Sequence, residues 1–304
     1  MARNSKKLEK LVGTGLMKLF GAVAYRVHDE DVALLGQSLG RLIWKISRRY
    51  RQVALKNLTF VYEHEKTPEE IEALARRVFE HFGQVAVEFF WLRRKTHQQI
   101  LALIDMPDEH KLNDLYAKGK GVIIISAHFG NWEAMGLRLV ASGHRCAVVA
   151  RDCDDPTQAE HINRVRRQGG FGTISKQEPA SRMFEILARN ELLGILPDQN
   201  TVDKPVFVPF FGKLASAAPG VSLLALRAGA PVIPGFAVRH KGRFHVELYP
   251  PIEIPTQGDL TQRIAQITAD YTSVIEQQIR KYPEQWLWFH DRWRRQPEPG
   301  ELPE

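Results

Sequence analysis

Short apolar runs that alternate with helical stretches fill residues 121–249, and this alternation limits the possible folds more than any other feature of the sequence. The first run, at 122–125, reads Val-Ile-Ile-Ile. Similar runs follow at 146–150, 172–174, 192–196, 231–238 and 244–249. Runs of this length are typical of strands buried on both faces, and strands that alternate with helices form mostly parallel sheets. The sequence therefore predicts an α/β fold with a mostly parallel central sheet flanked by helices.

The segments around these runs have the period and the end signals of helices. Helices are expected at 68–94, 131–140, 156–167, 180–190, 219–228 and 260–282. The first has the clearest start, because Thr67 is an N-cap residue, Pro68 suits the first turn and Glu70 completes a capping box. Residues 97–118 are expected to be helical in part, and the apolar stretch at 206–211 to be a loop.

The first sixty residues carry the excess positive charge of the protein. The whole chain has 42 Lys and Arg against 35 Asp and Glu, a net charge of +7, whereas residues 1–60 have twelve against four. Residues 11–27 are mostly apolar, but they include Lys18 and are shorter than the ~20 apolar residues that a spanning helix needs. We therefore expect an amphipathic helix on a membrane surface there, and a second helix over 31–60 whose basic end faces anionic headgroups. An ordinary surface helix and an ordinary core helix are the respective alternatives.

Composition argues against several classes of protein. The two cysteines, Cys146 and Cys153, provide no disulfide framework and are expected to be reduced thiols in a cytosolic compartment. The eleven histidines form no HExxH motif and no Cys/His pairs, so no metal site is predicted. No nucleic-acid-binding motif accompanies the basic charge, which favours an anionic membrane or a phosphorylated lipid as the partner.

Residues 126–133, Ser-Ala-His-Phe-Gly-Asn-Trp-Glu, place a histidine where the first strand ends and the next helix begins. This position in an α/β fold often presents catalytic groups. His128 and Glu133 would lie about 140° apart on one continuous helix, so they can meet only if the helix begins between them, near Asn131. Glu133 would then fix the tautomer of His128, whose other nitrogen takes a proton from a hydroxyl group. A hydrogen-bonded structural histidine is the alternative.

The surroundings of His128 favour chemistry on a substrate hydroxyl group. No GxSxG-type elbow supplies an enzyme nucleophile, so His128 would activate the substrate directly. Gly130 and Asn131 are expected to leave backbone N–H groups free at the helix start, where an oxyanion or a phosphate would bind. Asp198 and Gln199 follow another apolar run, and we expect Asp198 at the same edge of the sheet as His128.

The motif His-x4-Glu after an apolar strand resembles the signature of the glycerolipid acyltransferase superfamily. Further blocks resemble one branch of it, the late acyltransferases of bacterial lipid A synthesis of the lauroyl and myristoyl type. The blocks are SAHFGNWE at 126–133, Arg151, Arg164 with Arg166 before Gly169-Gly170, GILPDQ at 194–199, VFVPFFG at 206–212, GAPVIP at 229–234 and PEQWLWFHDRWRRQP at 283–297. They span well over half of the chain.

The resemblance implies that a fatty acyl chain moves from acyl carrier protein, or from acyl-CoA, to a hydroxyl group of a membrane glycolipid, which in this branch is a lipid A precursor. It implies His128 as the general base, Glu133 as its orienting partner, and no cofactor beyond the acyl thioester. Arg151 and Arg166 would bind phosphate or stabilise developing charge, with Arg164 as the alternate for the second of these roles. The implied substrate-binding residues are Asn131, Arg151, Arg164, Arg166, Asp198 and Gln199.

The expected organisation is an N-terminal helical membrane-associated segment (1–60), a catalytic domain (61–297) and a flexible tail (298–304). We expect a monomer on the cytoplasmic face of the bacterial inner membrane. One alternative keeps the chemistry but uses a lysophospholipid, an ornithine lipid or another glycolipid such as a phosphatidylinositol mannoside as the acceptor. Two others are a non-catalytic membrane or carrier-binding protein with this fold, and a metal-dependent hydrolase with His128, Glu133 and Asp198 as ligands.

Overall fold

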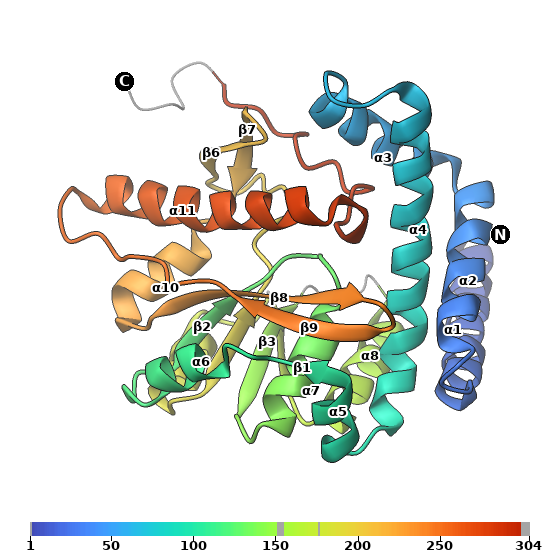
Figure 1. Ribbon diagram of the computed structural model, residues 1–304, viewed down its shortest axis with the longest axis horizontal. Coiled ribbons are helices and arrows are strands. Elements are labelled where there is room, and N and C mark those ends of the chain that lie inside the picture. Colours follow the sequence, from blue (N-terminus) through green and yellow to red (C-terminus); the bar gives the residue numbers. More distant parts are fainter. Residues whose placement is uncertain (1, 151–154, 176, 299–304) are drawn as a thin grey trace.

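A central sheet runs through the protein between layers of helices (Figure 1). The computed structural model describes residues 2–150, 155–175 and 177–298, with side chains from residue 14 onwards. Within these residues the sheet has seven strands in the order β1-β9-β8-β2-β5-β3-β4. They are β1 (Ile104–Asp105), β2 (Val122–Ile125), β3 (Cys146–Ala150), β4 (Gly172–Ser175), β5 (Leu192–Ile195), β8 (Val232–His240) and β9 (Arg243–Leu248). Every neighbouring pair is parallel except β8 and β9, which confirms the predicted fold class.

Helices cover both faces of this sheet. They are α5 (His97–Leu103), α6 (Glu109–Tyr116), α7 (Trp132–Ala141), α8 (Pro156–Gln168), α9 (Ser181–Ala188), α10 (Gly220–Ala228) and α11 (Leu260–Lys281). Successive side chains of a strand point to opposite faces. Ile123 and Ile125 of β2 are therefore buried in one core with α10 and α11, whereas Val122 and Ile124 are buried in a second core with α7.

Four further helices form the N-terminal part of the protein. They are α1 (Ala2–Arg26), α2 (Val32–Ile46), α3 (Arg48–Tyr62) and α4 (Pro68–Trp91). The long helix α4 stands between α1 and α2 on one side and the sheet on the other (Figure 1). It begins with the predicted capping box, because Thr67 Oγ1 accepts from the Glu70 N–H and Glu70 Oε2 accepts from the Thr67 N–H. It ends in a 3₁₀ turn, η1 (Leu92–Arg94).

The single helix predicted over 31–60 is wrong, because the chain forms two helices that meet at Ser47. There the backbone leaves the helical region, with φ −92° and ψ 73°. The break lets Trp44 of α2 pack edge-to-face on Phe79 of α4, with 5.2 Å between the ring centroids. It also lets Leu58 of α3 bury completely in the core next to the sheet. One straight helix would not reach both places.

Glycines bring α2 and α4 into direct backbone contact. A Cβ atom on Gly36 would lie 2.4 Å from the Cα atom of Gln84, and one on Gly40 would lie 2.2 Å from the carbonyl oxygen of Phe79. From the other helix, a Cβ atom on Gly83 would lie 2.2 Å from the carbonyl oxygen of Gly36. Any larger residue would push the helices apart, so glycine is what allows α2 to lie this close to α4.

The outer faces of the N-terminal helices expose large apolar side chains. They are Leu16, Leu19, Val23, Tyr25, Leu34, Leu42, Ile46 and Tyr50, and we call them the N-terminal apolar row. Within the described residues, no helix is long and apolar enough to cross a membrane. The predicted domain boundary at residue 60 stays a prediction, as does the tail at 298–304, most of which lies outside the described residues.

The loop predicted at 206–211 is wrong, because most of it is a strand. β6 (Val206–Phe210) pairs antiparallel with β7 (Lys213–Ala217) in a separate hairpin. Val208 and Phe210 point into the core and are each 1% exposed. Proline is found on edge strands, where no partner needs its missing N–H, and both strands of a two-stranded sheet are edges. The proline at position 209 made the segment look like a loop, but an edge strand such as β6 can contain it.

Candidate active site

His128 stands at the carboxyl end of β2, in the turn that leads to α7. Its ring nitrogen Nδ1 lies 2.8 Å from Oδ1 of Asp198, and its backbone N–H donates to Oδ2 of the same carboxylate at 2.8 Å. Asp198 follows β5, which pairs in parallel with β2 so that Ile125 lies beside Ile195. This register brings the two side chains together at one edge of the sheet, as expected for Asp198 from the sequence.

Asp198 is held as a carboxylate. Burial disfavours its ionised form, but the charge of His128 and hydrogen bonds from His128 and Trp286 outweigh burial and lower its pKa to about 2. The indole N–H of Trp286 donates to Oδ2 at 2.9 Å. Because a carboxylate only accepts hydrogen bonds, Nδ1 of His128 carries a proton and Nε2 is left as the basic nitrogen.

Glu133 is the partner of two arginines, so the expectation that it orients His128 is wrong. Oε2 of Glu133 accepts from Nη2 of Arg93 at 2.7 Å. Oε1 accepts from Nε and Nη2 of Arg166 at 3.0 and 2.7 Å. A metal site formed by His128, Glu133 and Asp198 would need the three side chains to converge, and this binding of Glu133 to arginines argues against it.

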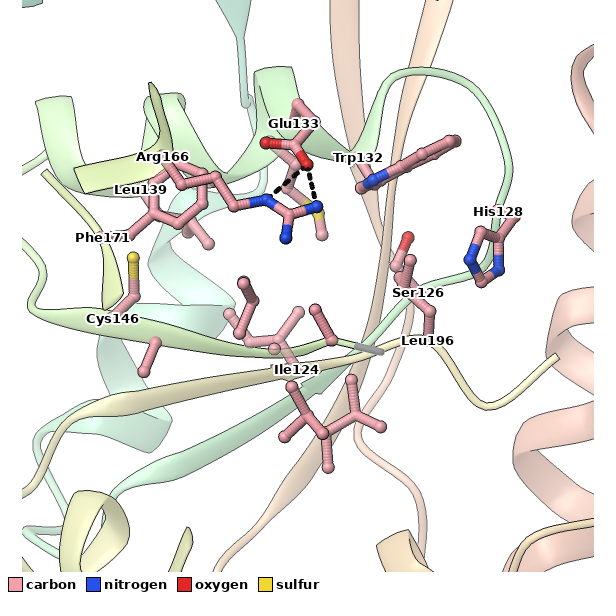
Figure 2. A pocket seen from close by; sticks show the side chains of 18 of the residues that line it. Ile124, Ser126, His128, Trp132, Glu133, Leu139, Cys146, Arg166, Phe171 and Leu196 are labelled. Carbon is pink, nitrogen blue, oxygen red and sulfur yellow. Dashed lines mark hydrogen bonds and ion pairs between the residues drawn. The ribbon is translucent and has the colours of Figure 1, made fainter. Parts of the chain in front are cut away.

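The start of α7 explains why the predicted pair does not form. The helix begins at Trp132, next to the expected start near Asn131. Asn131 caps it, and its Oδ1 accepts from the Ala134 N–H at 2.9 Å. The bulk of Trp132 then separates His128 from Glu133, as Figure 2 shows. The first helical turn directs Glu133 towards α8 and η1, where the arginines are, whereas the end of β5 lies on the histidine side.

Arg93 is a functional candidate that sequence reasoning missed. Its side chain is 1% exposed, and its Nη1 has no hydrogen-bond partner among the described residues. Burial lowers the pKa of Arg93, which the charge of Glu133 opposes. Burial would raise the pKa of Glu133, but Arg166 and Arg93 outweigh it and lower that pKa. Glu133 is therefore ionised, and because arginine side chains stay protonated in proteins, the cluster carries one excess positive charge.

The turn between His128 and α7 is tied to its neighbours through the backbone. Gly130 has a φ of +56°, and a Cβ atom there would lie 2.0 Å from the carbonyl oxygen of Ala237. The Gly130 N–H donates to the carbonyl of Gln285 and the Asn131 N–H to that of Ala237, each at 2.9 Å. Both N–H groups are therefore occupied, and the prediction that they are free to bind an oxyanion or a phosphate is wrong.

Side chains from α4 support the same turn. Nδ2 of Asn131, which is completely buried, donates to Glu88 at 2.8 Å, and Glu88 in turn pairs with Arg239. Nε2 of His81 lies 3.0 Å from the carbonyl oxygen of Gly130. Burial lowers the pKa of His81 to about 3, so its ring is neutral and donates this hydrogen bond. Asn131 thus serves the turn, which argues against its predicted contact with substrate.

A cavity of about 770 Å³, here called the strand cavity, begins at His128 and extends between α7 and the strands. Figure 2 shows Cys146 and Phe171 at the far end from His128, with Leu139 above them. At the histidine end, Nε2 of Gln199 lies 3.4 Å from Nε2 of His128. Most of the lining residues are apolar, and the polar ones lie both at His128 and, beyond Trp132, at Glu133 and Arg166. Such a lining suits a long apolar substrate that carries polar groups.

The remaining predicted residues lie in different places. Arg166 lines the strand cavity, whereas Arg164 is exposed and its guanidinium lies 2.8 Å from Nδ1 of His161. The choice between these two arginines thus favours Arg166. Arg151 and Cys153 lie outside the described residues. His290, which the sequence did not single out, also lines the cavity.

Comparison with known proteins matches this chain to one family along nearly its whole length. The family model described as bacterial lipid A biosynthesis acyltransferase matches residues 5–295. The chain is 26% identical over 297 residues to a lipid A biosynthesis lauroyltransferase of Escherichia coli (strain K12), which covers 94% of this chain and 92% of the relative. It is 24% identical over 294 residues to a lipid A biosynthesis palmitoleoyltransferase of the same organism, with 94% and 90% covered.

A second kind of relative differs in its printed activity. A phosphatidylinositol mannoside acyltransferase of Mycobacterium tuberculosis (strain CDC 1551 / Oshkosh) is 23% identical over 220 residues, which cover 70% of this chain and 68% of the relative. The relatives thus differ in the lipid that they acylate but share acyl transfer. On the extent of the family match, the chain belongs to the bacterial lipid A biosynthesis acyltransferase family.

Proposed function

We propose that this protein transfers a fatty acyl chain from a thioester to a hydroxyl group of a lipid A precursor, with His128 as the general base and Asp198 as its orienting partner. The observation that carries the proposal is the 2.8 Å pair between Nδ1 of His128 and Asp198 at the mouth of an apolar cavity. A carboxylate on Nδ1 fixes the tautomer of His128, so Nε2 is the nitrogen that can accept a proton, and it points Nε2 in one direction. Asp198 thus takes the role of orienting His128, which the sequence had assigned to Glu133.

In the proposed reaction, Nε2 of His128 removes the proton from the acceptor hydroxyl group while the hydroxyl oxygen attacks the thioester carbonyl carbon. The new C–O bond gives a tetrahedral oxyanion, and the C–S bond then breaks. The proton on Nε2 passes to the leaving sulfur, so the products are an ester and a thiol. Asp198 stays ionised throughout, because its pKa is about 2, and it stabilises the imidazolium that forms between the two proton transfers.

Two side chains are placed to stabilise charge in this reaction. The side-chain amide of Gln199 lies 3.4 Å from Nε2 of His128, so it is beside the atoms that react and serves as a hydrogen-bond donor to the oxyanion. Arg166 lines the strand cavity with its charge only partly neutralised by Glu133, which it shares with Arg93. We assign to Arg166 the binding of a phosphate on the donor or on the acceptor.

The donor chain is proposed to lie in the strand cavity. Its walls between His128 and Cys146 include Leu139, Phe171 and Leu192, so each methylene of an acyl chain that enters leaves water for an apolar surface. The thioester would then stand beside His128. Acyl carrier protein is the proposed carrier, and acyl-CoA is the alternative that delivers the same thioester.

We also propose that the N-terminal apolar row rests on the cytoplasmic face of the inner membrane. Exposed basic residues lie close to these side chains in the sequence, among them Lys18, Arg41, Lys45 and Arg48. Apolar side chains that insert at the level of the headgroups, together with basic residues that attract anionic lipids, are typical of a surface-bound helix. This location would bring the active site to a lipid acceptor that does not leave the bilayer.

The test is lipid mass spectrometry of a host that lacks the gene and carries either the wild-type protein, His128→Ala or His64→Ala. His64 is a matched control, because its side chain is 93% exposed and distant from the site in sequence. We expect one additional acyl chain on lipid A with the wild type and with His64→Ala, and its loss with His128→Ala. An additional acyl chain on a different glycolipid would mean that this glycolipid, and not a lipid A precursor, is the acceptor. If the His128→Ala protein restores the lipid as fully as the wild type does, the role is non-catalytic and the proposal is overturned.

A further inference from the structure

A second cavity lies between the N-terminal helices and α8. Its volume is about 540 Å³, and we call it the helix cavity. Most of its walls come from α1, α2, α4 and α8, and most of the lining side chains are apolar. The side chains that form most of them include Met17, Phe20, Ile43, Phe82, Phe89 and Ile162. A cavity this apolar binds hydrocarbon in preference to a polar group.

The inner end of the helix cavity meets the strand cavity. Trp132, Glu133 and Arg166 line both cavities. The ring of Trp132 lies 5.3 Å from that of His128 and 6.2 Å from that of Phe82, measured between centroids. Trp132 is therefore the wall between the catalytic histidine and the helix cavity. A molecule in the helix cavity would have its inner end next to the reacting atoms.

The outer end of the helix cavity opens within the N-terminal apolar row. Tyr50 lines the cavity and is 52% exposed, so it belongs to the rim. Ile43 lines the cavity from α2, where its neighbours Leu42 and Ile46 are 53% and 69% exposed. Met17 does the same from α1, next to the exposed Leu16. The helix cavity and the N-terminal apolar row therefore share Tyr50, and at Met17 and Ile43 they are formed by residues close in sequence.

We propose that the helix cavity holds an acyl chain of the acceptor glycolipid while its hydroxyl group reaches His128. This inference rests on the proposed function, because it assigns the second substrate of the same reaction. A lipid that rises from a bilayer exposes its methylenes to water unless a protein surface covers them. The helix cavity provides such a cover between the proposed membrane-facing row and the active site.

The donor chain is assigned to the strand cavity and the acceptor chain to the helix cavity because the two substrates arrive from different places. The donor arrives on a soluble carrier, and the strand cavity lies deep between α7 and the sheet, where β2, β3 and β5 form its floor. The acceptor arrives from the membrane, and the helix cavity begins at the helices that carry exposed apolar side chains. The two chains would then meet on either side of Trp132, with the ester bond formed at His128.

Ala86 of α4 lines the helix cavity, so Ala86→Leu would fill part of it without adding charge. Ala73, which is exposed on the same helix, gives the matched control Ala73→Leu. The acceptors are a lipid A precursor and a chain-shortened analogue of it, both in phosphatidylglycerol-containing vesicles, with an acyl carrier protein thioester as donor. We expect Ala86→Leu to raise the KM for the long-chain acceptor about tenfold. The KM for the donor, the preferred donor chain length and the use of the short-chain acceptor should stay as in Ala73→Leu.

A binding measurement separates this inference from the proposed function. In a His128→Ala background, which prevents turnover, vesicles containing the acceptor with brominated acyl chains should quench tryptophan fluorescence, and Trp132→Phe should remove most of that quenching. Quenching that persists in the Ala86→Leu protein, or a change in donor chain length with that variant, would overturn the inference. Quenching in the expected pattern from a wild-type protein that transfers no acyl chain would instead refute the proposed function and leave the lipid site standing.

Discussion

His128 and Asp198 are 70 residues apart in the chain, and yet the carboxylate meets both the ring Nδ1 and the backbone N–H of the histidine at 2.8 Å. Two bonds from one carboxylate fix the ring relative to its own backbone. Trp286 then fixes the carboxylate from the other side, at 2.9 Å. The direction of Nε2 is therefore set by three segments of the chain that are distant in sequence.

Replacing Asp198 with asparagine should reduce turnover with little effect on substrate binding. The side-chain amide of asparagine can donate to Nδ1 and so favour the wrong tautomer of His128, and it provides no charge to stabilise the imidazolium. We expect Asp198→Asn to lower kcat by about 10²- to 10⁴-fold, with KM within a few-fold of wild type. Asp203→Asn, at an exposed position in the same loop region, is the control. A variant with near wild-type kcat would remove Asp198 from the mechanism.

Replacing Glu133 should destabilise the protein, because Glu133 neutralises buried arginines. In Glu133→Ala, Arg93 would keep its charge at 1% exposure without the carboxylate that pairs with it. The loss of one partner of a buried ion pair costs about 3–5 kcal/mol. Urea unfolding followed by circular dichroism measures this cost. Combining Glu133→Ala with Arg93→Met should recover part of it, whereas equal stability of wild type and Glu133→Ala would contradict the assignment.

Acid should weaken the fold through His81. Burial lowers its pKa from the ordinary 6.5 to about 3. Below pH 6.5 the unfolded chain therefore binds a proton that the folded protein does not bind until about pH 3. The contribution of His81 to stability is complete above pH 6.5 and falls as the pH drops, by about 2 kcal/mol between pH 6.5 and 5.

His81→Gln isolates this term, because the glutamine amide can still donate to Gly130 but does not titrate. Free energies of unfolding should be measured for both proteins from pH 8 to pH 5. The difference between them should change by about 2 kcal/mol over the acid part of this range. Parallel curves would mean that His81 is protonated in the folded protein, or exposed.

Binding to anionic vesicles should depend on both salt and the N-terminal apolar row. Added salt should weaken it, because the basic residues attract the surface through screened charge. The double variant Leu42→Ser/Ile46→Ser should bind at least tenfold more weakly, because two exposed apolar side chains leave the interface. Leu260→Ser is the matched control, since Leu260 is 51% exposed but lies on α11. Vesicle sedimentation measures the binding, and equal retention of all variants would place the membrane contact elsewhere.

Apolar runs made most of the sheet predictable, because a strand buried on both faces leaves a local pattern. β2, β3, β5 and β8 all appear where their runs predict them. The break at Ser47 was not predictable in the same way, since each half of 31–60 keeps a helical period. Only the position of α4 and of the sheet core requires the chain to turn there.

The location of the candidate active site was predictable from the sequence, but the partner of His128 was not. Parallel strands place whatever follows them at one edge, so His128 and Asp198 were expected at the same end of the sheet. The choice between Glu133 and Asp198 depends on the direction of side chains in a single helical turn, which no spacing in the sequence specifies. Arg93 left no signal at all, because it sits next to another arginine and its partner is forty residues away.

The contact between α2 and α4 through glycines has a mechanical consequence. Gly83 faces α2, and His81, two residues earlier and on the opposite side of α4, holds the turn that carries His128. Helix α2 and the turn that carries His128 are therefore separated by little more than the diameter of α4, ~10 Å. If the N-terminal apolar row rests on a bilayer, α4 acts as a rigid spacer that sets the distance of His128 from the lipid surface. Acceptors would then be selected by the distance of their hydroxyl group from the membrane surface. This selection would not depend on side-chain contacts with the rest of the lipid.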